Sequence, residues 1–234
     1  MRSWRATLLS LGLAWFCLPA IGAVDPGVAT APRMEFAPPP PGSYRLEKIQ
    51  TVTDATLLDA NGRPTRLSTL TTSRVTLLTF FYTYCVDPIG CPFAYHVLTD
   101  VRRRMLDEAG LAGRVRFVSV SLDPTTDTPE ALARYRDMAT RGTGFEWNFL
   151  TTRSVRDLLP VLNDFGQDVS VERAADGTER RTLHHMLKMF LIDDDANVRE
   201  IYTLAYLHPA VIENDIRTLL MEQGARARRT AAAE

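Results

Sequence analysis

The sequence is poor in cysteine and histidine, with three cysteines and four histidines among 234 residues. This scarcity excludes a small scaffold held together by many disulfides, because such chains are dense in cysteine. It also leaves few combinations of side chains for a transition-metal site. Any metal or thiol chemistry must therefore use one of a small number of residue sets.

An excess of basic residues is also missing. The chain has 27 Lys and Arg against 28 Asp and Glu, a net charge of −1 at pH 7 with neutral histidine. Loss of residues 1–23 would remove Arg2 and Arg5 but no acid, and would lower the net charge to −3. A domain that binds nucleic acid needs a basic surface, so we expect no nucleic-acid partner.

One N-terminal segment has the pattern of a targeting signal. Residues 1–23 combine a basic start, an almost uncharged apolar run at 6–19 and a small-residue stretch at 20–23, as expected of a cleaved signal peptide. A run of about 18 apolar residues is also near the lower limit for a membrane span, so an N-terminal anchor is the alternative. In both cases the basic end predicts that the domain faces the periplasm.

The rest of the chain predicts one domain and a linker. Residues 24–44 are rich in Pro and Ala and lack apolar periodicity, which indicates an extended linker. The length of residues 45–223 suits one packed domain, and we expect residues 224–234 to be a disordered tail. No signal for oligomerisation is present, so we expect a monomer.

Strand and helix patterns alternate through residues 45–223. Apolar runs at 75–82 and 115–122 predict buried central strands, and Asn61-Gly62 predicts a tight turn between two short strands. The further expected elements are a helix from 91, a helix from about 128 to 140, a strand at 145–151, a helix at 155–165, a hairpin at 168–182, strands at 183–192 and 197–204, and a helix at 209–223. This order predicts an α/β fold with a central mixed sheet, helices on both faces and an inserted hairpin.

Cys85 and Cys91 are the two cysteines outside the N-terminal segment. Cys85 comes at the end of a predicted strand, and Cys91 precedes Pro92 at a predicted helix start. Because a helix N-terminus lowers a thiol pKa, we expect Cys91 to ionise more readily than Cys85. In an oxidising compartment the pair predicts either a disulfide or a site for a soft metal.

A third ligand would have to come from four histidines. His96 lies on the predicted helix and is expected to be an ordinary surface or packing residue, and His208 precedes Pro209 at a helix start. His184 and His185 lie next to each other on a predicted strand, so their side chains point to opposite faces and only one can meet the cysteines. Spacing does not choose between them.

Three aspartates lie near these candidate ligands or at the end of the next strand. Asp123 follows a predicted strand at the sheet edge where α/β proteins place their sites, so it is either an accessory group near the cysteines or a turn residue. Either Asp127 or Thr128 is expected to cap the next helix, and Asp87 to form a turn before Pro88 rather than to bind metal.

Several motifs together resemble the Sco/SenC family of copper proteins over about residues 45–222. They are Phe80-Phe81-Tyr82-Thr83-Tyr84-Cys85, Cys91-Pro92, the stretch from Ser121 to Pro129, and His185 five residues before Phe190-Leu191-Ile192-Asp193. The resemblance implies a thioredoxin-like fold and copper, as Cu(I) or Cu(II), bound by Cys85, Cys91 and His185. The family usually places three residues between its cysteines, whereas residues 86–90 make five here.

The resemblance also implies a function: a periplasmic metallochaperone that assists assembly of the copper centre of cytochrome c oxidase or a related copper enzyme. The expected partners are a copper-accepting oxidase subunit or other copper enzyme and a thiol reductant protein. On this interpretation the chain is not an enzyme. The alternatives are a thiol-disulfide oxidoreductase that uses Cys85 and Cys91 as a redox disulfide, and a binding module with a structural disulfide.

Overall fold

The computed structural model describes residues 34–173 and 179–233. The predicted signal or anchor at 1–23, the first part of the linker and the Asp176-Gly177 turn lie outside the described residues. None of the helices in the described ranges is long and apolar enough to span a bilayer.

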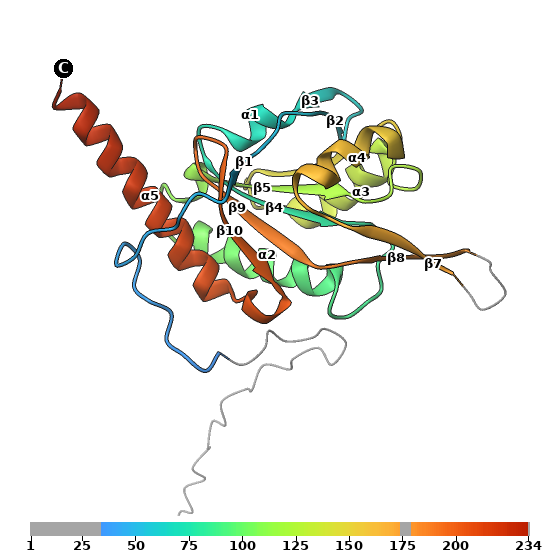
Figure 1. Ribbon diagram of the computed structural model, residues 1–234, viewed down its shortest axis with the longest axis horizontal. Helices are drawn as coiled ribbons and strands as arrows, with labels where there is room; N and C mark the ends of the chain where they lie inside the picture. Colours follow the sequence, from blue (N-terminus) through green and yellow to red (C-terminus); the bar gives the residue numbers. More distant parts are fainter. Residues whose placement is uncertain (1–33, 174–178, 234) are drawn as a thin grey trace, which may run out of the picture.

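The core of the fold is one eight-stranded sheet in the order β1-β10-β9-β4-β5-β6-β2-β3 (Figure 1). Strands β4, β5 and β6 are parallel, whereas β9 and β10 add an antiparallel pair beside β4. The strands of this sheet are β1 Gln50–Thr51, β2 Thr56–Asp59, β3 Pro64–Arg66, β4 Val75–Phe81, β5 Val115–Ser121, β6 Trp147–Thr151, β9 Lys188–Ile192 and β10 Asn197–Thr203.

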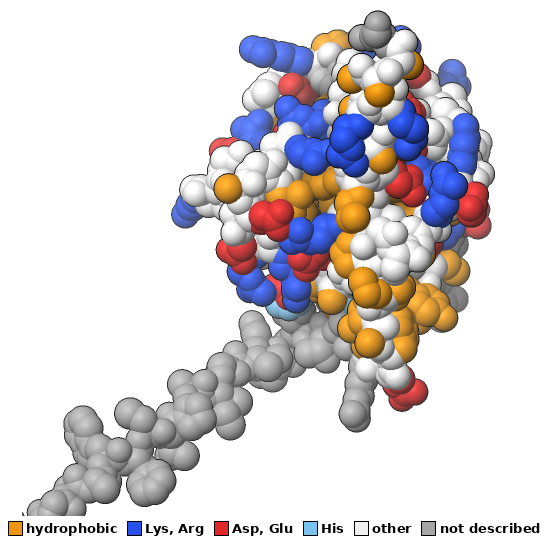
Figure 2. All heavy atoms as spheres, turned by 90° about the vertical axis from the view of Figure 1, so that its left-hand side faces the viewer, with side chains coloured by type: hydrophobic (Ala, Val, Ile, Leu, Met, Phe, Trp, Pro, Cys, Tyr) orange, Lys and Arg blue, Asp and Glu red, His pale blue; other side chains and the backbone are white. Residues whose placement is uncertain are grey.

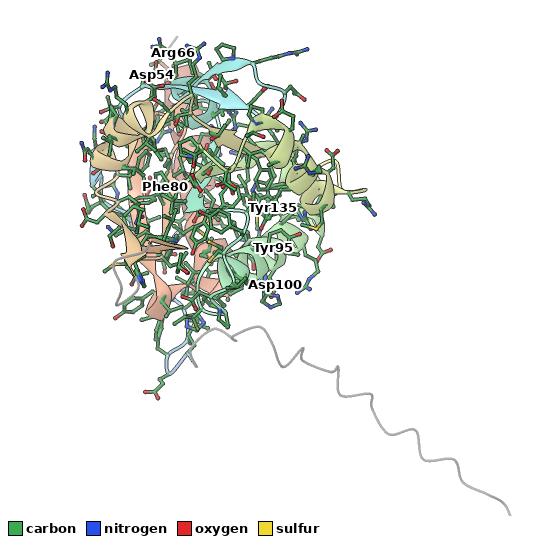
Figure 3. All side chains as sticks on the ribbon, turned by 90° about the vertical axis from the view of Figure 1, so that its right-hand side faces the viewer. Asp54, Arg66, Phe80, Tyr95, Asp100 and Tyr135 are labelled. Carbon is green, nitrogen blue, oxygen red and sulfur yellow. The ribbon has the colours of Figure 1, made fainter. Side chains whose placement is uncertain are left out.

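Helices cover both faces of the sheet, which confirms the predicted mixed α/β architecture. They are α1 Leu67–Thr71, α2 Cys91–Leu106, α3 Pro129–Thr140, α4 Val155–Asp164 and α5 Pro209–Ala231, with short 3-10 turns η1 Ala112–Arg114 and η2 Leu204–Tyr206. Figure 3 shows Tyr95 of α2 and Tyr135 of α3 on one side of the sheet and Phe80 in the interior.

The central strand β4 packs in both directions because all seven of its residues are buried. The Phe81 ring lies 5.3 Å from that of Tyr135 in α3, whereas the Phe80 ring lies 5.5 Å from that of Phe165 at the end of α4. Successive side chains of a strand point to opposite faces, so this one dipeptide supplies the core on each side of the sheet. The end of β4 is therefore firmly placed, and the Cys85 segment begins from a rigid base.

The inserted hairpin forms a separate two-stranded sheet of β7 Val169–Arg173 and β8 Glu179–His185 (Figure 1). The prediction of a continuous strand at 183–192 is wrong, because β8 ends at His185 and β9 begins at Lys188. Gln167 Nε2 donates a hydrogen bond of 3.1 Å to the carbonyl of Met186, which lies between the two strands. Neither Met186 nor Leu187 is a typical turn-forming residue, so no local pattern indicates this break.

The last helix is longer than expected, since α5 continues to Ala231 where a disordered tail had been predicted at 224–234. The extension is rich in Ala and Arg, which are strong helix formers. Arg226 also makes ion pairs with Asp194 and Asp195 in the turn after β9. Figure 2 shows basic side chains gathered around the C-terminal part of α5 and hydrophobic ones along its earlier part.

The final part of the predicted linker is attached to α5. Asn214 Nδ2 donates a hydrogen bond of 2.9 Å to the Pro39 carbonyl, and the Gly42 N–H donates one of 3.0 Å to Thr218 Oγ1. The Tyr44 hydroxyl donates to the carboxylate of Asp215. Residues 39–44 are thus fixed along the helix rather than extended away from the domain.

Candidate metal and thiol site

Cys85 and Cys91 lie at the carboxyl end of β4, on either side of a loop that leads into α2. Cys91 is the first residue of α2 and is buried, with Gly90 at the N-cap position, whereas Cys85 is partly exposed. Both cysteines are free thiols, so the predicted disulfide stays a prediction. The Cys91 thiol donates a hydrogen bond to the sulfur of Cys85, which places the two sulfurs in contact.

Hydrogen bonding makes Cys85 the more acidic thiol of the pair. The bond from Cys91, together with one from the Tyr82 hydroxyl, outweighs burial and lowers the pKa of Cys85 to about 5. The same bond and burial raise the pKa of Cys91 far above its ordinary value. The expectation that Cys91 ionises first is therefore wrong, because a buried thiol that donates to its neighbour keeps its proton despite its place at a helix N-terminus.

His185 is the last residue of β8, and its ring centroid lies 6.1 Å from that of Tyr82. Its Nδ1 lies 3.3 Å from the Met186 carbonyl, which can only accept a hydrogen bond, so Nδ1 carries the hydrogen and Nε2 is left for a ligand. Burial lowers the pKa of His185, which keeps the ring neutral and able to bind a metal. His184 is exposed.

A single cavity joins these groups. It has a volume of about 920 Å³ and lies between the Cys85–Gly90 loop, β8 and η2. Cys85, His184 and His185 line it, and its wall includes Ile89 and Met186, which are 49% and 62% exposed. Much of the cavity wall is apolar.

Asp127 and Asp123 have different roles. Of the two residues expected to cap α3, Asp127 is not the cap: it is fully buried and accepts hydrogen bonds from the Ser121 and Thr83 hydroxyls. These bonds join the end of β5 to the segment that follows β4. Thr128 caps α3 instead, with its Oγ1 accepting from the Ala131 N–H at 3.4 Å. Burial raises the pKa of Asp127.

Asp123 is both a turn residue and a neighbour of the site. Its carboxylate accepts a hydrogen bond of 3.0 Å from the Thr125 N–H and one of 2.6 Å from the Tyr84 hydroxyl. Burial alone would raise the pKa of Asp123, but the bonds from Thr125 and Tyr84 outweigh it and lower the pKa. The Tyr84 ring lies 4.8 Å from that of Tyr82, whose hydroxyl bonds to Cys85. Two tyrosines thus connect the predicted accessory residue to Cys85.

Sequence reasoning missed Tyr82 and Tyr84 as members of the site. Both belong to the motif before Cys85, but nothing in their spacing indicates that one hydroxyl bonds to Cys85 and the other to Asp123. The remaining histidines lie elsewhere: His96 is exposed on α2, and His208 is buried at the N-cap position of α5 without a side-chain capping bond.

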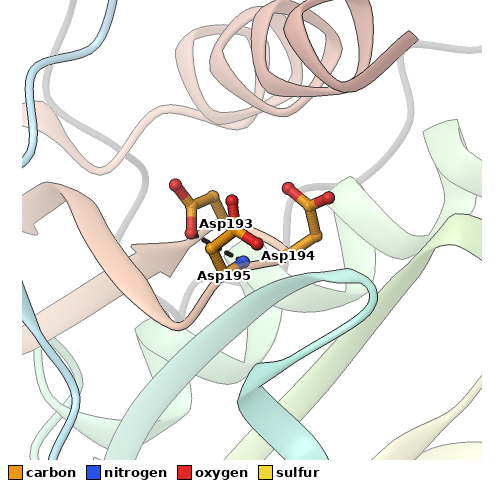
Figure 4. Close-up of side chains that lie close together, drawn as sticks. All are labelled: Asp193, Asp194 and Asp195. Carbon is orange, nitrogen blue, oxygen red and sulfur yellow. Dashed lines mark hydrogen bonds between the residues drawn. The ribbon is translucent and has the colours of Figure 1, made fainter. Parts of the chain in front are cut away.

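A second group of potential ligands lies in the turn between β9 and β10. Asp193, Asp194 and Asp195 have carboxylate oxygens within 4.8 Å of one another, and no other set of three His, Cys, Asp or Glu residues in the described ranges meets that limit (Figure 4). Arg199 pairs with Asp193 at 3.0 Å, and Arg226 pairs with the other two aspartates. Each of the three aspartates is thus already paired with an arginine. The ligand atoms of Cys85, Cys91 and His185 do not all approach within 4.8 Å.

Comparison with known proteins identifies the family. The family model described as SCO1/SenC matches residues 45–221. The chain belongs to this family. A comparison with curated protein sequences found no significant match.

Solved structures of SCO1/SenC proteins share the fold. ScoI of Bradyrhizobium japonicum with copper bound is 21% identical, with a TM-score of 0.58 over 72% of this chain and 99% of that one. A SCO1/SenC family lipoprotein of Bacillus anthracis is 24% identical, with a TM-score of 0.60 over 73% and 95% of the two chains. BsSco is 22% identical, with a TM-score of 0.55 over 74% of this chain and 95% of that one. It is described as having a disulfide switch and as a member of the Sco family of cytochrome c oxidase assembly proteins. These likenesses confirm the predicted thioredoxin-like fold of the family.

Proposed function

We propose that this chain binds copper through the thiolates of Cys85 and Cys91 and Nε2 of His185, and delivers it to the copper centre of cytochrome c oxidase or a related copper enzyme. One observation carries the proposal: Cys85 and His185 line one cavity, and the Cys91 thiol contacts the Cys85 sulfur. Membership of the SCO1/SenC family supports it, because relatives include a structure with copper bound and a cytochrome c oxidase assembly protein.

The protonation states of the three groups suit this role. Thiolates are the ligands that Cu(I) prefers, and imidazole suits both Cu(I) and Cu(II). At neutral pH Cys85 is a thiolate and His185 is neutral, so only Cys91 has to lose a proton when copper binds. Copper binding would also draw His185 and the cysteines closer together, since their ligand atoms are not yet all within 4.8 Å.

The cavity wall supports transfer to a protein partner. Because Ile89 and Met186 expose apolar surface beside the ligands, a loop of a copper-accepting oxidase subunit can pack there while its own ligands replace those of this chain one by one. A thiol reductant protein would keep Cys85 and Cys91 reduced between cycles. On this proposal the protein acts as a monomeric metallochaperone and not as an enzyme.

The proposed location is the periplasm, because residues 1–23 have the pattern of a signal peptide or an N-terminal anchor. A related structure comes from a lipoprotein, which supports attachment of this kind of domain to a membrane. Labelling the chain from outside intact spheroplasts, followed by N-terminal sequencing, tests both the compartment and the choice between cleavage and anchoring.

A second candidate function is thiol-disulfide exchange with a partner. The contact between Cys91 and the Cys85 sulfur favours it, because a low-pKa thiolate beside a second thiol is the arrangement that forms and resolves a mixed disulfide. His185 separates the two functions. A copper site needs its Nε2, whereas exchange between the two sulfurs does not.

The test is a titration of the purified, reduced protein with Cu(I) and with Cu(II), recording stoichiometry and thiolate-to-copper absorption. We expect a single copper per chain, lost in Cys85→Ser and strongly weakened in His185→Ala. His96→Ala is the matched control, because His96 is an exposed histidine on α2, and it should bind copper as the wild type does. A folded, fully reduced protein that binds no copper would overturn the proposal and place thiol-disulfide exchange first.

A further inference from the structure

The loop between the two cysteines brings a carboxylate to the cavity. Asp87 lies in this loop and lines the same cavity as Cys85 and His185. Asp87 is also near Cys85, because its backbone N–H donates a hydrogen bond to the Cys85 sulfur. A carboxylate therefore lines the same cavity as the thiolate and the imidazole of the proposed site.

Gly90 makes this close approach possible. A Cβ at this position would lie 3.2 Å from the Cβ of Asp87 and 3.3 Å from the sulfur of Cys85. Both contacts are tighter than ordinary packing, so a larger residue would require Asp87 or the Cys85 sulfur to shift by a few tenths of an ångström. The side chain of Asp87 and the sulfur of Cys85 thus border the same small space.

The turn formed by Asp87 uses only part of its hydrogen-bonding capacity. Its Oδ1 accepts a bond of 3.1 Å from the Ile89 N–H, and its carbonyl accepts one of 2.9 Å from the Gly90 N–H. No described residue donates a hydrogen bond to Oδ2, and the side chain is exposed at the edge of the cavity. The aspartate can therefore hold the turn with one oxygen and offer the other to a cation.

We propose that Asp87 supplies a fourth, carboxylate ligand to the copper site and so favours Cu(II) over Cu(I). This inference rests on the proposed function. Carboxylate oxygens suit the harder Cu(II), which takes a tetragonal set of N and O donors, whereas two thiolates satisfy the softer Cu(I). A negative charge beside the metal also favours the more highly charged ion. Asp87 would therefore set which oxidation state the protein holds most tightly.

The test is Asp87→Asn, measured by separate titrations with Cu(I) and Cu(II) and by the electron paramagnetic resonance spectrum of the Cu(II) form. Asparagine keeps the size of the side chain and an Oδ1 that accepts from Ile89, so the turn is retained while the charged ligand is lost. Removal of a metal-site partner typically costs 10- to 100-fold in affinity, and we expect a loss of about that size for Cu(II) with less than about threefold for Cu(I). The Cu(II) spectrum should change as well.

Two further variants make the result decisive. Asp59→Asn is the matched control, because Asp59 Oδ1 also accepts backbone N–H bonds in a turn, between β2 and β3, and this variant should match the wild type. Asp87→Glu keeps a carboxylate and should retain part of the preference for Cu(II). Equal losses for Cu(I) and Cu(II) in Asp87→Asn, or no loss at all, would overturn the inference.

The outcomes also distinguish this inference from the proposed function. If copper binding depends on Cys85 and His185 but is the same in Asp87→Asn, only the role of Asp87 is wrong. If the wild-type protein binds neither Cu(I) nor Cu(II), both the proposed function and the proposed role of Asp87 are wrong.

Discussion

Two groups of potential metal ligands lie at opposite ends of the central sheet. Cys85 follows the carboxyl end of β4, whereas Asp193 follows β9, whose last residue, Ile192, is paired with Thr76 near the start of β4. The aspartate cluster is the more compact of the two, with its oxygens within 4.8 Å of one another. By distance alone it would be the better metal site.

The partners of each group reverse that ranking. Arg199 and Arg226 already form ion pairs with the aspartates, and Asp193 Oδ1 accepts a hydrogen bond of 2.9 Å from the Asn197 N–H. At the other end, Cys85 is held as a thiolate by hydrogen-bond donors, and Nε2 of His185 is left over once Nδ1 is bound. The comparison shows that the hydrogen bonds and ion pairs a ligand group already makes matter more than the distances between the ligand atoms. They decide whether a cluster can bind a cation.

The largest expected effect is the loss of stability in Asp193→Ala. Arg199 is 11% exposed in its side chain, and the substitution would remove one of its two carboxylate partners within a largely buried network. Removal of one partner of a buried ion pair costs about 3 kcal/mol or more, and we expect a loss near that value in denaturant unfolding. Copper binding by the folded variant should be unchanged.

The matched control for Asp193 is Asp195→Ala. Asp195 is 66% exposed and pairs with Arg226 at only 3.6 Å, so its removal should cost less than about 1 kcal/mol. Loss of copper binding in a folded Asp193→Ala protein would contradict the division between a structural and a metal-binding cluster.

The second prediction concerns the reactivity of the thiols. Alkylation requires the thiolate, so the rate at Cys85 should rise as the pH rises through about 5 and then level off, whereas Cys91 should stay protonated at neutral pH. At pH 7 we expect Cys85 to react at least about tenfold faster, as measured by mass spectrometry of peptides from the reduced, metal-free protein.

Tyr82→Phe sharpens this measurement. The variant removes a hydrogen bond to the Cys85 sulfur and should move the midpoint of its alkylation to higher pH. Tyr206→Phe is the control, because Tyr206 is 61% exposed, and its midpoint should match the wild type. Faster alkylation of Cys91 than of Cys85 would show that the helix N-terminus dominates after all.

The smallest expected effect is that of Arg226→Ala. Arg226 is 38% exposed and holds α5 to the turn between β9 and β10 through Asp194 and Asp195. Exposed ion pairs contribute little, so the free energy of unfolding should fall by no more than about 1 kcal/mol. Hydrogen exchange should quicken at the end of α5 and nowhere near Cys85. A protein-wide increase would mean that this ion pair supports the whole fold.

Much of the fold follows from local patterns in the sequence. The apolar runs predicted β4 and β5, Asn61-Gly62 predicted the β2–β3 turn, and Pro92 marked the start of α2. Each of these signals acts within a few residues, so it does not depend on what lies elsewhere in the chain. At the break between β8 and β9, Gln167 bonds to Met186 from another part of the chain, a contact that no local pattern in the sequence records.

The candidate site was predicted less completely than the fold. Motifs selected Cys85, Cys91 and His185, but the order of ionisation was wrong because it depends on burial and on the Cys91 to Cys85 hydrogen bond. Asp127 was assigned to a helix cap because its hydrogen bonds to Thr83 and Ser121 join segments that are separate in sequence. Electrostatics at the site arises from contacts across the sheet edge, which a linear pattern does not record.

The attachment of residues 39–44 to α5 also sets how far the domain can reach. Because Asn214 donates to the Pro39 carbonyl and the Gly42 N–H donates to Thr218, the chain is attached to α5 from Pro39 onward and not only from Tyr44. Six residues extend to about 20 Å, so a domain tethered by its N-terminus would sweep a correspondingly smaller radius. A shorter linker raises the effective concentration of the domain near partners that lie close to the point of attachment. It lowers the effective concentration near distant partners.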